Sequence, residues 1–480
     1  MFWIPIDRTK SVPLIRQIYD QIRIRILHGE LAAGERLPST RELASSLGIS
    51  RNVAIEAYDQ LFVEGYVEGK KGSGTYVAKG AYLDAVEQTE ARSPFDIYQS
   101  ENKPNDYIDF RSGLPALDMF PRKSWGKIAK QVCEDASDSI FGYDHPEGRI
   151  ELRHVLSRYL KRTRGVHCHP DQLIITSGAT QALSLIANLL LSPGDEVMIE
   201  DPITDEIQTI FTSPGATLYP IPVDKEGIKT KLFPRNRKPK FIFVTPSHQF
   251  PLGGTLSIQR RIQLIHYARK NDCFIVEDDY DSEFRYHGSP IHSLQGLDPD
   301  NVIYIGTFSK ILSPGLRLGY IILPPALIRH CKDLKWFTDL HTPSLEQLTI
   351  ARFIDNRDLE RHIRKMKKVY RTRRDFLKEC LKKAFGTEVV VSGDSTGLHL
   401  IAEFNNITFS EQIVHTIIQK YHIKVYPVEH HTIQKGKHSN KLILGYGNLS
   451  LEDIKEGIQR LKQAVTHEII KHKKPLSLHS

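Results

Sequence analysis

Cysteine is scarce in this sequence, and long hydrophobic runs are missing. The five cysteines among 480 residues are widely scattered, and no two form a CxxC pair. Such a sparse, odd set argues against a disulfide framework and a zinc site, and favours a reducing compartment. The longest apolar run, near Leu183–Leu191, is short and contains Asn188, so we expect no membrane span. Because the N-terminal residues do not resemble a signal peptide, we expect a cytoplasmic protein.

A strong excess of charge of one sign is also missing. The chain carries 65 Lys and Arg against 57 Asp and Glu, a net charge of +8. A basic surface favours polyanions, but over this length the excess alone does not indicate nucleic-acid binding. Apolar residues make up 40% and charged residues 25%, which are globular values. A chain of this length is expected to form two or three domains.

Residues 11–80 predict three helices followed by a two-stranded hairpin. Isoleucines recur at helical spacing from Ile15 to Ile26, and His28-Gly29 ends that helix. Ser39 and Glu42 match a capping box that opens the second helix. Ser50 caps the third helix, and a glycine-rich turn then separates two short strands, residues 66–67 and 75–77. A helix, a helix–turn–helix and a two-stranded wing together form a DNA-binding arrangement.

In a helix–turn–helix the first residues of the second helix face base edges in the major groove. Arginine suits guanine, asparagine suits adenine, and lysines beside a glycine on a wing suit phosphates or the minor groove. The alternative is an ordinary helical domain, since residues 1–80 carry only 11 Lys and Arg against 9 Asp and Glu. The residues expected at double-stranded DNA are Arg41, Ser50, Arg51, Asn52, Ala54, Lys70, Lys71 and Gly72.

The remaining sequence predicts a linker and a large α/β domain. Residues 81–106 are polar and without periodicity, which is typical of a linker. From about residue 107 to 470, short apolar strands alternate with helices, which predicts a mostly parallel sheet. Residues 385–465 predict a smaller α+β subdomain. The predicted strands are Leu173–Thr176, Glu196–Ile199, Phe241–Val244, Cys273–Val276 and Val302–Ile305.

Four kinds of polar group follow these strands. Lys310 lies just beyond the strand that ends at Ile305, and Asp278 and Tyr280 follow the strand that ends at Val276. Ligands bind outside the carboxyl ends of the strands in open α/β sheets. An amine, a carboxylate, a phenol and phosphate donors are what pyridoxal phosphate (PLP) requires. Taken singly, each motif is more often an ordinary surface or loop feature.

Each group has a specific expected role. Lys310, the catalytic candidate, would form the Schiff base, Asp278 would pair with the pyridinium nitrogen, and Tyr280 would bind the phenolic oxygen. Arginine and hydroxyl side chains bind phosphate oxygens, and so do the N–H groups at a helix N-terminus. The phosphate is therefore expected at Ser309, Arg317, Gly178, Ala179 and Thr180.

Two known families resemble parts of the chain. Leu37-Pro38-Ser39-x-Arg41, Ser50-Arg51 and Gly72-x-Gly74-Thr75 resemble the winged helix of GntR-type regulators. Residues 107–465 resemble fold-type I aminotransferases, and the whole chain resembles the MocR subfamily, which fuses the two parts. The resemblance implies a mostly α winged helix–turn–helix joined to an α/β aminotransferase-like domain. It also implies a head-to-tail homodimer with swapped heads, in which Tyr143 reaches the partner's phosphate and His248 lies in the loop beside the cofactor ring.

The sequence departs from the aminotransferase pattern at two places. The arginine that grips a substrate α-carboxylate is replaced by Asn448. The aromatic residue that stacks on the ring is replaced by Thr204, and two acids, Asp205 and Glu206, follow it. We therefore expect inefficient transamination, at most residual half-reactions, and an effector that is an amine, a less acidic molecule or the cofactor itself.

Two other features are interpreted conservatively. Residues 357–383 carry 12 Lys and Arg against 4 Asp and Glu above an apolar stripe. This favours a long surface helix, with a second DNA contact as the alternative. His430-His431 has no further ligand nearby in sequence and favours a loop over a metal site, so no metal is expected.

These observations favour a PLP-dependent transcription regulator that senses a small effector molecule. One alternative is an active aminotransferase with an accessory DNA-binding head. Another is a DNA-binding scaffold that has lost its cofactor. Asn448 disfavours the first alternative, and Lys310 with Asp278 disfavours the second.

Overall fold

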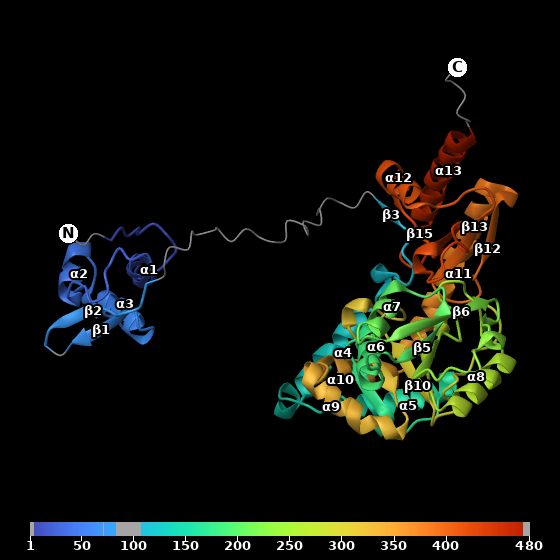
Figure 1. Ribbon diagram of the computed structural model, residues 1–480, viewed down its shortest axis with the longest axis horizontal. Coiled ribbons are helices and arrows are strands. Elements are labelled where there is room, and N and C mark those ends of the chain that lie inside the picture. Colours follow the sequence, from blue (N-terminus) through green and yellow to red (C-terminus); the bar gives the residue numbers. More distant parts are fainter. Residues whose placement is uncertain (1–3, 71, 83–106, 474–480) are drawn as a thin grey trace, which may run out of the picture. The chain divides into compact units, whose positions relative to one another are not determined.

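The computed structural model describes residues 4–70, 72–82 and 107–473, and the chain divides into two compact units, Met1–Asn102 and Lys103–Ser480 (Figure 1). Each unit is described by itself. Nearly all of the predicted linker lies outside the described residues. Within the described part, no helix is both long and apolar enough to cross a membrane.

The first unit is a helical head with a small hairpin. Its buried core is formed by one face of each helix, and Ile18, Ile22 and Leu61 have no exposed surface. The predicted capping box is confirmed, because the Ser39 side chain accepts from the Glu42 backbone N–H and the Glu42 side chain accepts from the Ser39 N–H. The elements are α1 (Leu14–Leu27), α2 (Thr40–Leu47), α3 (Arg51–Val63), β1 (Val67–Lys70) and β2 (Gly74–Val77).

The second unit is built on an eight-stranded mixed sheet. The strand order is β4-β11-β10-β9-β8-β5-β6-β7. The strands from β10 to β6 run parallel to their neighbours, whereas β11 and β7 pair antiparallel. The bounds are β4 (Leu173–Thr176), β5 (Glu196–Asp201), β6 (Thr217–Asp224), β7 (Gly227–Ile228), β8 (Phe241–Val244), β9 (Phe274–Asp279), β10 (Val302–Thr307) and β11 (Gly319–Ile322).

Helices cover both faces of this sheet. On β5, Val197 and Ile199 belong to one buried cluster, whereas Met198 belongs to another. Strands that are buried on both faces have continuous apolar sequences, which is the pattern seen here. The helices of this part are α4 (Arg122–Asp135), α5 (Ile150–Arg164), α6 (Ala179–Leu190), α7 (Asp205–Thr212), α8 (Ile258–Asn271), α9 (Ile328–Asp339) and α10 (Ser344–Asp355).

A smaller antiparallel subdomain follows the long helix α11 (Asp358–Phe385), as Figure 1 shows. Its sheet has the order β12-β13-β16-β15. The chain's entry segment joins it, because β3 (Ile108–Asp109) pairs in parallel with β14 (Ile423–Lys424). The other elements are β12 (Val389–Ser392), β13 (His399–Phe404), α12 (Glu411–Tyr421), β15 (Tyr426–Pro427), β16 (Lys441–Gly445) and α13 (Leu451–Lys473).

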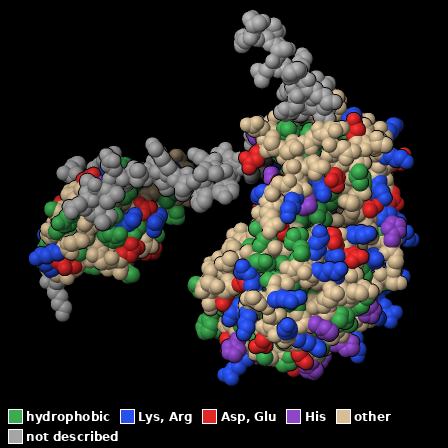
Figure 2. Space-filling model, turned by 45° about the vertical axis from the view of Figure 1, so that its right-hand side comes forward, with side chains coloured by type: hydrophobic (Ala, Val, Ile, Leu, Met, Phe, Trp, Pro, Cys, Tyr) green, Lys and Arg blue, Asp and Glu red, His purple; other side chains and the backbone are tan. Residues whose placement is uncertain are grey.

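The basic segment 357–383 is a helix, as predicted. The apolar side of α11 is buried at Met366, Tyr370 and Leu377. Some of its cations have acidic partners, such as Lys378 with Asp394 at 2.5 Å. On the visible face of the second unit, Lys and Arg side chains are interspersed with Asp and Glu (Figure 2).

Candidate functional site

The head presents the start of α3 to solvent. Ser50 caps this helix by accepting from the Val53 N–H at 3.4 Å, and Gly48 in the preceding turn has a left-handed backbone. Arg51 and Asn52 are exposed in the first turn of α3. The expectation that Ala54 faces DNA is wrong, because its side chain is fully buried in the head core.

The other predicted DNA residues lie on α2 and the wing. Arg41 is exposed in the first turn of α2. On the wing, the Lys70 ammonium lies 4.6 Å from the centre of the Tyr76 ring, and Gly72 has a φ of 75°, which favours glycine. Lys71 lies outside the described residues. The described candidates are therefore all solvent-accessible, apart from Ala54.

Lys310 and Asp278 lie at the same edge of the large sheet. β9 and β10 are adjacent parallel strands in which Ile305 pairs with Asp278, and Lys310 follows β10 by three residues. Burial lowers the pKa of the Lys310 amine, an effect that Asp281 opposes. Gly113 packs against this amine, because a Cβ there would lie 2.8 Å from Lys310 Nζ. Lys310 is thus a confined amine whose charged neighbours include the acids Asp281 and Asp278 and one cation, Arg111.

Asp278 is a buried carboxylate with an unused oxygen. Its Oδ1 is shielded from solvent and has no hydrogen-bond partner among the described residues. Burial raises the pKa of Asp278 to about 7, and the neighbouring Asp279 adds to the effect. A buried, unsatisfied carboxylate is costly unless a cation or donor pairs with it. A protonated pyridine nitrogen is such a partner.

Tyr280 and His248 lie together beside this carboxylate. The Tyr280 hydroxyl donates to the His248 carbonyl oxygen at 3.0 Å, and the two rings stack with centres 5.8 Å apart. Burial raises the pKa of Tyr280 well above its usual range, so its hydroxyl remains protonated. Tyr280 therefore offers one donor at this edge of the sheet.

A second group of donors lies at the N-terminus of α6. Gly178 precedes this helix with a φ of 98°, and the Arg317 guanidinium packs against it, 3.3 Å from where a Cβ would be. Gly319 at the start of β11 also approaches the Gly178 backbone closely. Ser309, which directly precedes Lys310, is buried. Its hydroxyl accepts from the Thr307 hydroxyl at 3.0 Å. Arg317 and the α6 N-terminus, which includes Ala179 and Thr180, thus form a cationic donor set suited to phosphate.

Tyr143 is not part of this group within one chain. Its side chain is 82% exposed, and its ring lies against His341 at 6.3 Å. Because its side chain is exposed, Tyr143 is available for contact with another subunit. The resemblance implies such a contact, with the phosphate of the partner subunit.

Several residues at the site were not found from the sequence. Arg164 is buried and donates to Asp279 at 2.7 Å and to the Ser247 hydroxyl at 2.8 Å. Arg164 and Asp279 are 115 positions apart, so no local pattern links them. Asp281 and His399 were also missed. Asp281 lies only three residues after Asp278, and that spacing is the one sequence signal that was available.

The residues that replace the aminotransferase pattern have structural partners. Asn448 Oδ1 accepts from the Leu117 N–H at 3.1 Å, and Thr204 caps α7 by accepting from the Ile207 N–H at 3.4 Å. Asp205 lies 3.7 Å from His431 Nδ1. His431 ends a 3₁₀ turn, Val428–His431, so the predicted loop is a short helical turn.

Comparisons with known proteins assign a different family to each of the two units. Residues 14–77 match the family "Bacterial regulatory proteins, gntR family", and residues 105–461 match "Aminotransferase class I and II". The chain is 34% identical to the probable rhizopine catabolism regulatory protein MocR of Rhizobium meliloti, over 96% of this chain and 95% of that protein. It belongs to the MocR type of GntR regulators. It is also 28% identical to the pyridoxine biosynthesis regulator PdxR of Corynebacterium glutamicum, over 95% of this chain and 96% of that protein.

Solved structures place the second unit of this MocR-type chain among the aminotransferases. A kynurenine aminotransferase from Pyrococcus horikoshii is 30% identical and superposes with a TM-score of 0.70, covering 78% of this chain and 93% of that one. The α-aminoadipate aminotransferase LysN of Thermus thermophilus is 25% identical with the same TM-score, covering 76% and 93%. The predicted fold class is thereby confirmed, and the chain is a helix–turn–helix transcription regulator with an aminotransferase-like domain.

Proposed function

We propose that this MocR-type regulator binds PLP at Lys310 and uses it to sense an amine. The observation that carries the proposal is that a confined amine, Lys310, and an unsatisfied buried carboxylate, Asp278, lie at the same edge of two adjacent strands and interact electrostatically. When bound, PLP supplies an aldehyde that condenses with primary amines. The fold supports the assignment, because class I and II aminotransferases typically use this cofactor.

The chain's own residues fit the parts of the cofactor. Lys310 Nζ would hold the aldehyde carbon, Asp278 would neutralise the ring nitrogen, and Tyr280 would donate to the phenolic oxygen with His248 beside it. Ser309, Arg317 and the backbone of Gly178, Ala179 and Thr180 would hold the phosphate. In the proposed head-to-tail dimer, the exposed Tyr143 would complete the phosphate site of the partner subunit.

The head would bind operator DNA through α3 and the wing. Arg51 and Asn52, exposed at the start of α3, would reach base edges, while Arg41, Ser50, Lys70, Lys71 and Gly72 would contact phosphates or the minor groove. Closure of the large domain around an effector would change how the two heads of the dimer meet their half-sites. By linkage, operator DNA would change effector affinity by the same factor.

Three acids, Asp281, Asp278 and Glu206, act on Lys310 against one cation, Arg111, and this balance favours a cationic effector over a carboxylate. Glu206 interacts electrostatically with both Lys310 and His431, so it lies within range of both. Burial lowers the pKa of His431, so this imidazole is neutral at pH 7 and does not offset the acids. Asn448 stands where the aminotransferase pattern has an arginine, so this position offers no guanidinium group that could pair with an effector carboxylate.

Two measurements test the proposal. The purified chain supplied with PLP should become yellow, and borohydride should label Lys310. The Lys310→Ala variant should show neither the colour nor the label. Lys332 is half-buried, and the control variant Lys332→Ala should show both, as the parent does. Titration should then give a tighter spectral response to putrescine than to γ-aminobutyrate or glutamate. A colourless chain without label at Lys310 refutes cofactor binding, and a tight response to γ-aminobutyrate alone refutes the effector class. Sustained turnover of amino acids would instead indicate an aminotransferase.

A further inference from the structure

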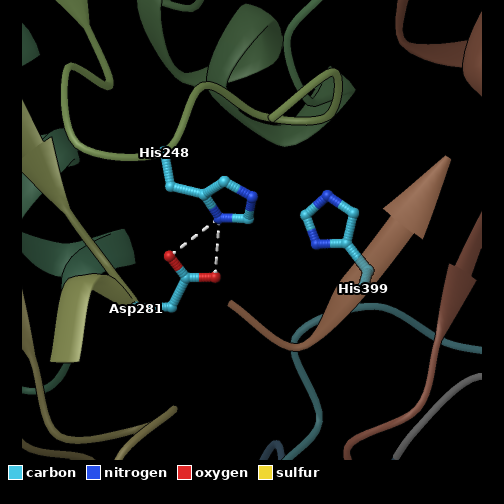
Figure 3. A group of neighbouring side chains, drawn as sticks. All are labelled: His248, Asp281 and His399. Atoms are coloured by element: carbon cyan, nitrogen blue, oxygen red, sulfur yellow. Dashed lines mark hydrogen bonds and ion pairs between the residues drawn. The ribbon is translucent and has the colours of Figure 1, made fainter. Parts of the chain in front are cut away.

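A buried acid–imidazole pair lies behind Tyr280. His248 Nδ1 lies 3.0 Å from both carboxylate oxygens of Asp281, and their side chains are 1% and 3% exposed (Figure 3). His248 Nε2 is buried and has no hydrogen-bond partner among the described residues. The pair touches the candidate cofactor site through the Tyr280 hydroxyl, which lies 3.1 Å from His248 Nδ1 and donates to the His248 carbonyl at 3.0 Å.

His399 extends this group into the small subdomain. It is the first residue of β13, and its ring centre lies 5.0 Å from that of His248. Its Nε2 donates to the Pro251 carbonyl at 2.9 Å. Burial and the neighbouring His248 lower the pKa of His399 to about 3, so the ring is neutral and has a single N–H, which Pro251 occupies. His399 therefore holds the loop 248–251 of the large domain at two points.

The backbone just before β13 packs closely against the side chains of Asp281 and His248. A Cβ on Gly397 would lie 2.2 Å from Asp281 Oδ2 and 2.4 Å from His248 Cε1. The Gly397 carbonyl accepts from the hydroxyls of Tyr286 at 2.6 Å and Tyr446 at 2.8 Å. A shift of the His248–Asp281 pair towards Gly397 would therefore displace the backbone just before β13.

A metal ion does not explain the group. Candidate ligand atoms of His248, Asp281 and His399 all lie within 4.8 Å of one another. However, Asp281 lies on the Nδ1 side of His248, whereas the Nε2 side of that ring faces His399 (Figure 3). At most two imidazole nitrogens face a common point, and a structural zinc site requires four ligands.

We propose that His399 is a positioning residue that couples occupancy of the Lys310 site to the small subdomain. The inference rests on the proposed function, because the occupant is PLP. The Tyr280 hydroxyl has one proton to donate. When it donates to the phenolic oxygen of a bound cofactor, the His248 carbonyl loses its donor. The loop 248–251 then readjusts, and the Pro251–His399 hydrogen bond together with the Gly397 packing carries the change into β13.

Hydrogen exchange with and without PLP tests this coupling on the full chain. In the parent, PLP should change the exchange of the β13 amides, residues 399–404, by about 5-fold or more, the lower end of typical site–site coupling. His399→Leu, which removes the donor to Pro251, should bring that PLP-dependent change below about 2-fold, whereas His399→Gln, which keeps a donor, should retain part of it. His415→Gln, at an exposed histidine on α12, is the matched control and should keep the whole change.

The readout separates coupling from a merely structural role. A structural role would raise exchange in β13 equally with and without PLP, so the PLP-dependent difference would remain, and that outcome overturns the proposal. Should His399→Leu fail to fold, Tyr280→Phe perturbs the same group from its other end and should also abolish the difference. Labelling of Lys310 with borohydride is measured in parallel. Labelling without any PLP-dependent change in β13 refutes the coupling alone, whereas absence of labelling refutes the proposed function.

Discussion

Ile305 on β10 pairs with Asp278 on β9, and this register sets Lys310 and the Asp278 carboxylate at one edge of the parallel part of the sheet. Asp278 lies on β9, and Lys310 lies in the turn three residues after β10, so the pairing of the two strands brings both groups to this edge. Asp278 Oδ1 has no partner among the described residues, so the carboxylate is available to a ligand between the two. The most direct prediction concerns this oxygen.

Asp278→Asn should bind PLP more weakly without losing the reactive amine. A neutral amide cannot compensate the charge of a protonated ring nitrogen, and a hydrogen bond to a charged group contributes about 1.5–3 kcal/mol. The affinity for PLP should therefore fall roughly 10- to 150-fold. The change is measured by absorbance titration, with borohydride labelling at saturating PLP to show that Lys310 still reacts. Unchanged affinity would show that Asp278 does not contact the ring nitrogen.

The buried acids make the stability of the PLP-free chain dependent on pH. Burial raises the pKa of Glu200 to about 7 from an ordinary value of 4.5, and Glu277 behaves in the same way. Since the folded pKa exceeds the unfolded one, the folded state binds more protons between about pH 4.5 and 7, and its stability falls as the pH rises through that window. The PLP-free chain should thus unfold at a lower temperature at pH 8 than at pH 5.5, measured by thermal melts.

Glu200→Gln isolates one contribution to this pH dependence. Glu200 Oε2 accepts from the Thr245 N–H and hydroxyl, and a glutamine carbonyl oxygen can accept the same two bonds. The variant removes a buried charge at pH 8 without removing an acceptor, so it should be about 1–3 kcal/mol more stable than the parent at pH 8 and nearly equal to it at pH 5.5. A variant that is destabilised equally at both pH values would contradict this assignment.

The sequence predicted β4, β5, β8, β9 and β10 of the large sheet but not β6, β7 and β11, and it did not predict the polar ends of the strands. β4 and β8 have the predicted bounds, whereas β9 and β10 extend to Asp279 and Thr307 because their polar last residues remain in the sheet. β6 was missed because it contains two prolines, Pro220 and Pro222, and proline argues against an inner strand. Hydrophobic pattern locates a strand's apolar centre, and only tertiary pairing sets its ends.

Site residues were predictable where they follow a strand and not where a distant segment supplies them. Lys310 and Asp278 follow from the rule that ligands bind at the carboxyl ends of strands. His399 lies on a different sheet, and its contact with His248 depends on how the subdomain packs, which no local pattern encodes. Ala54 was wrongly predicted to face DNA. The prediction considered its place in the first turn of α3 but not which side of that helix is buried.

Arg51 and Ala54 should therefore respond differently to substitution. Arg51→Ala removes an exposed side chain, so it should weaken binding to the preferred operator by about 1–3 kcal/mol and leave the melting temperature unchanged. Ala54→Leu overpacks a fully buried position and should destabilise the head by about 1–3 kcal/mol. Fluorescence anisotropy on operator fragments captured from genomic DNA, paired with thermal melts, distinguishes the two effects. Loss of stability in Arg51→Ala would show that its role is structural.

Glu206→Gln tests the expected preference for a cationic effector. Glu206 is exposed at the start of α7 and interacts electrostatically with Lys310 and with the neutral His431. If an amine bound at Lys310 carries a second ammonium group, the Glu206 carboxylate is within range of that group. In PLP-loaded protein, putrescine should bind more tightly than propylamine. Glu206→Gln should reduce that advantage by about 1.4- to 5-fold, as expected for a solvent-exposed ion pair of about 0.2–1 kcal/mol. The affinity for propylamine should hardly change, because it carries no second charge. Glu452→Gln, an exposed glutamate on α13, is the matched control. If the variant weakens both amines equally, Glu206 acts on Lys310 itself, and the second ammonium of putrescine has its partner elsewhere.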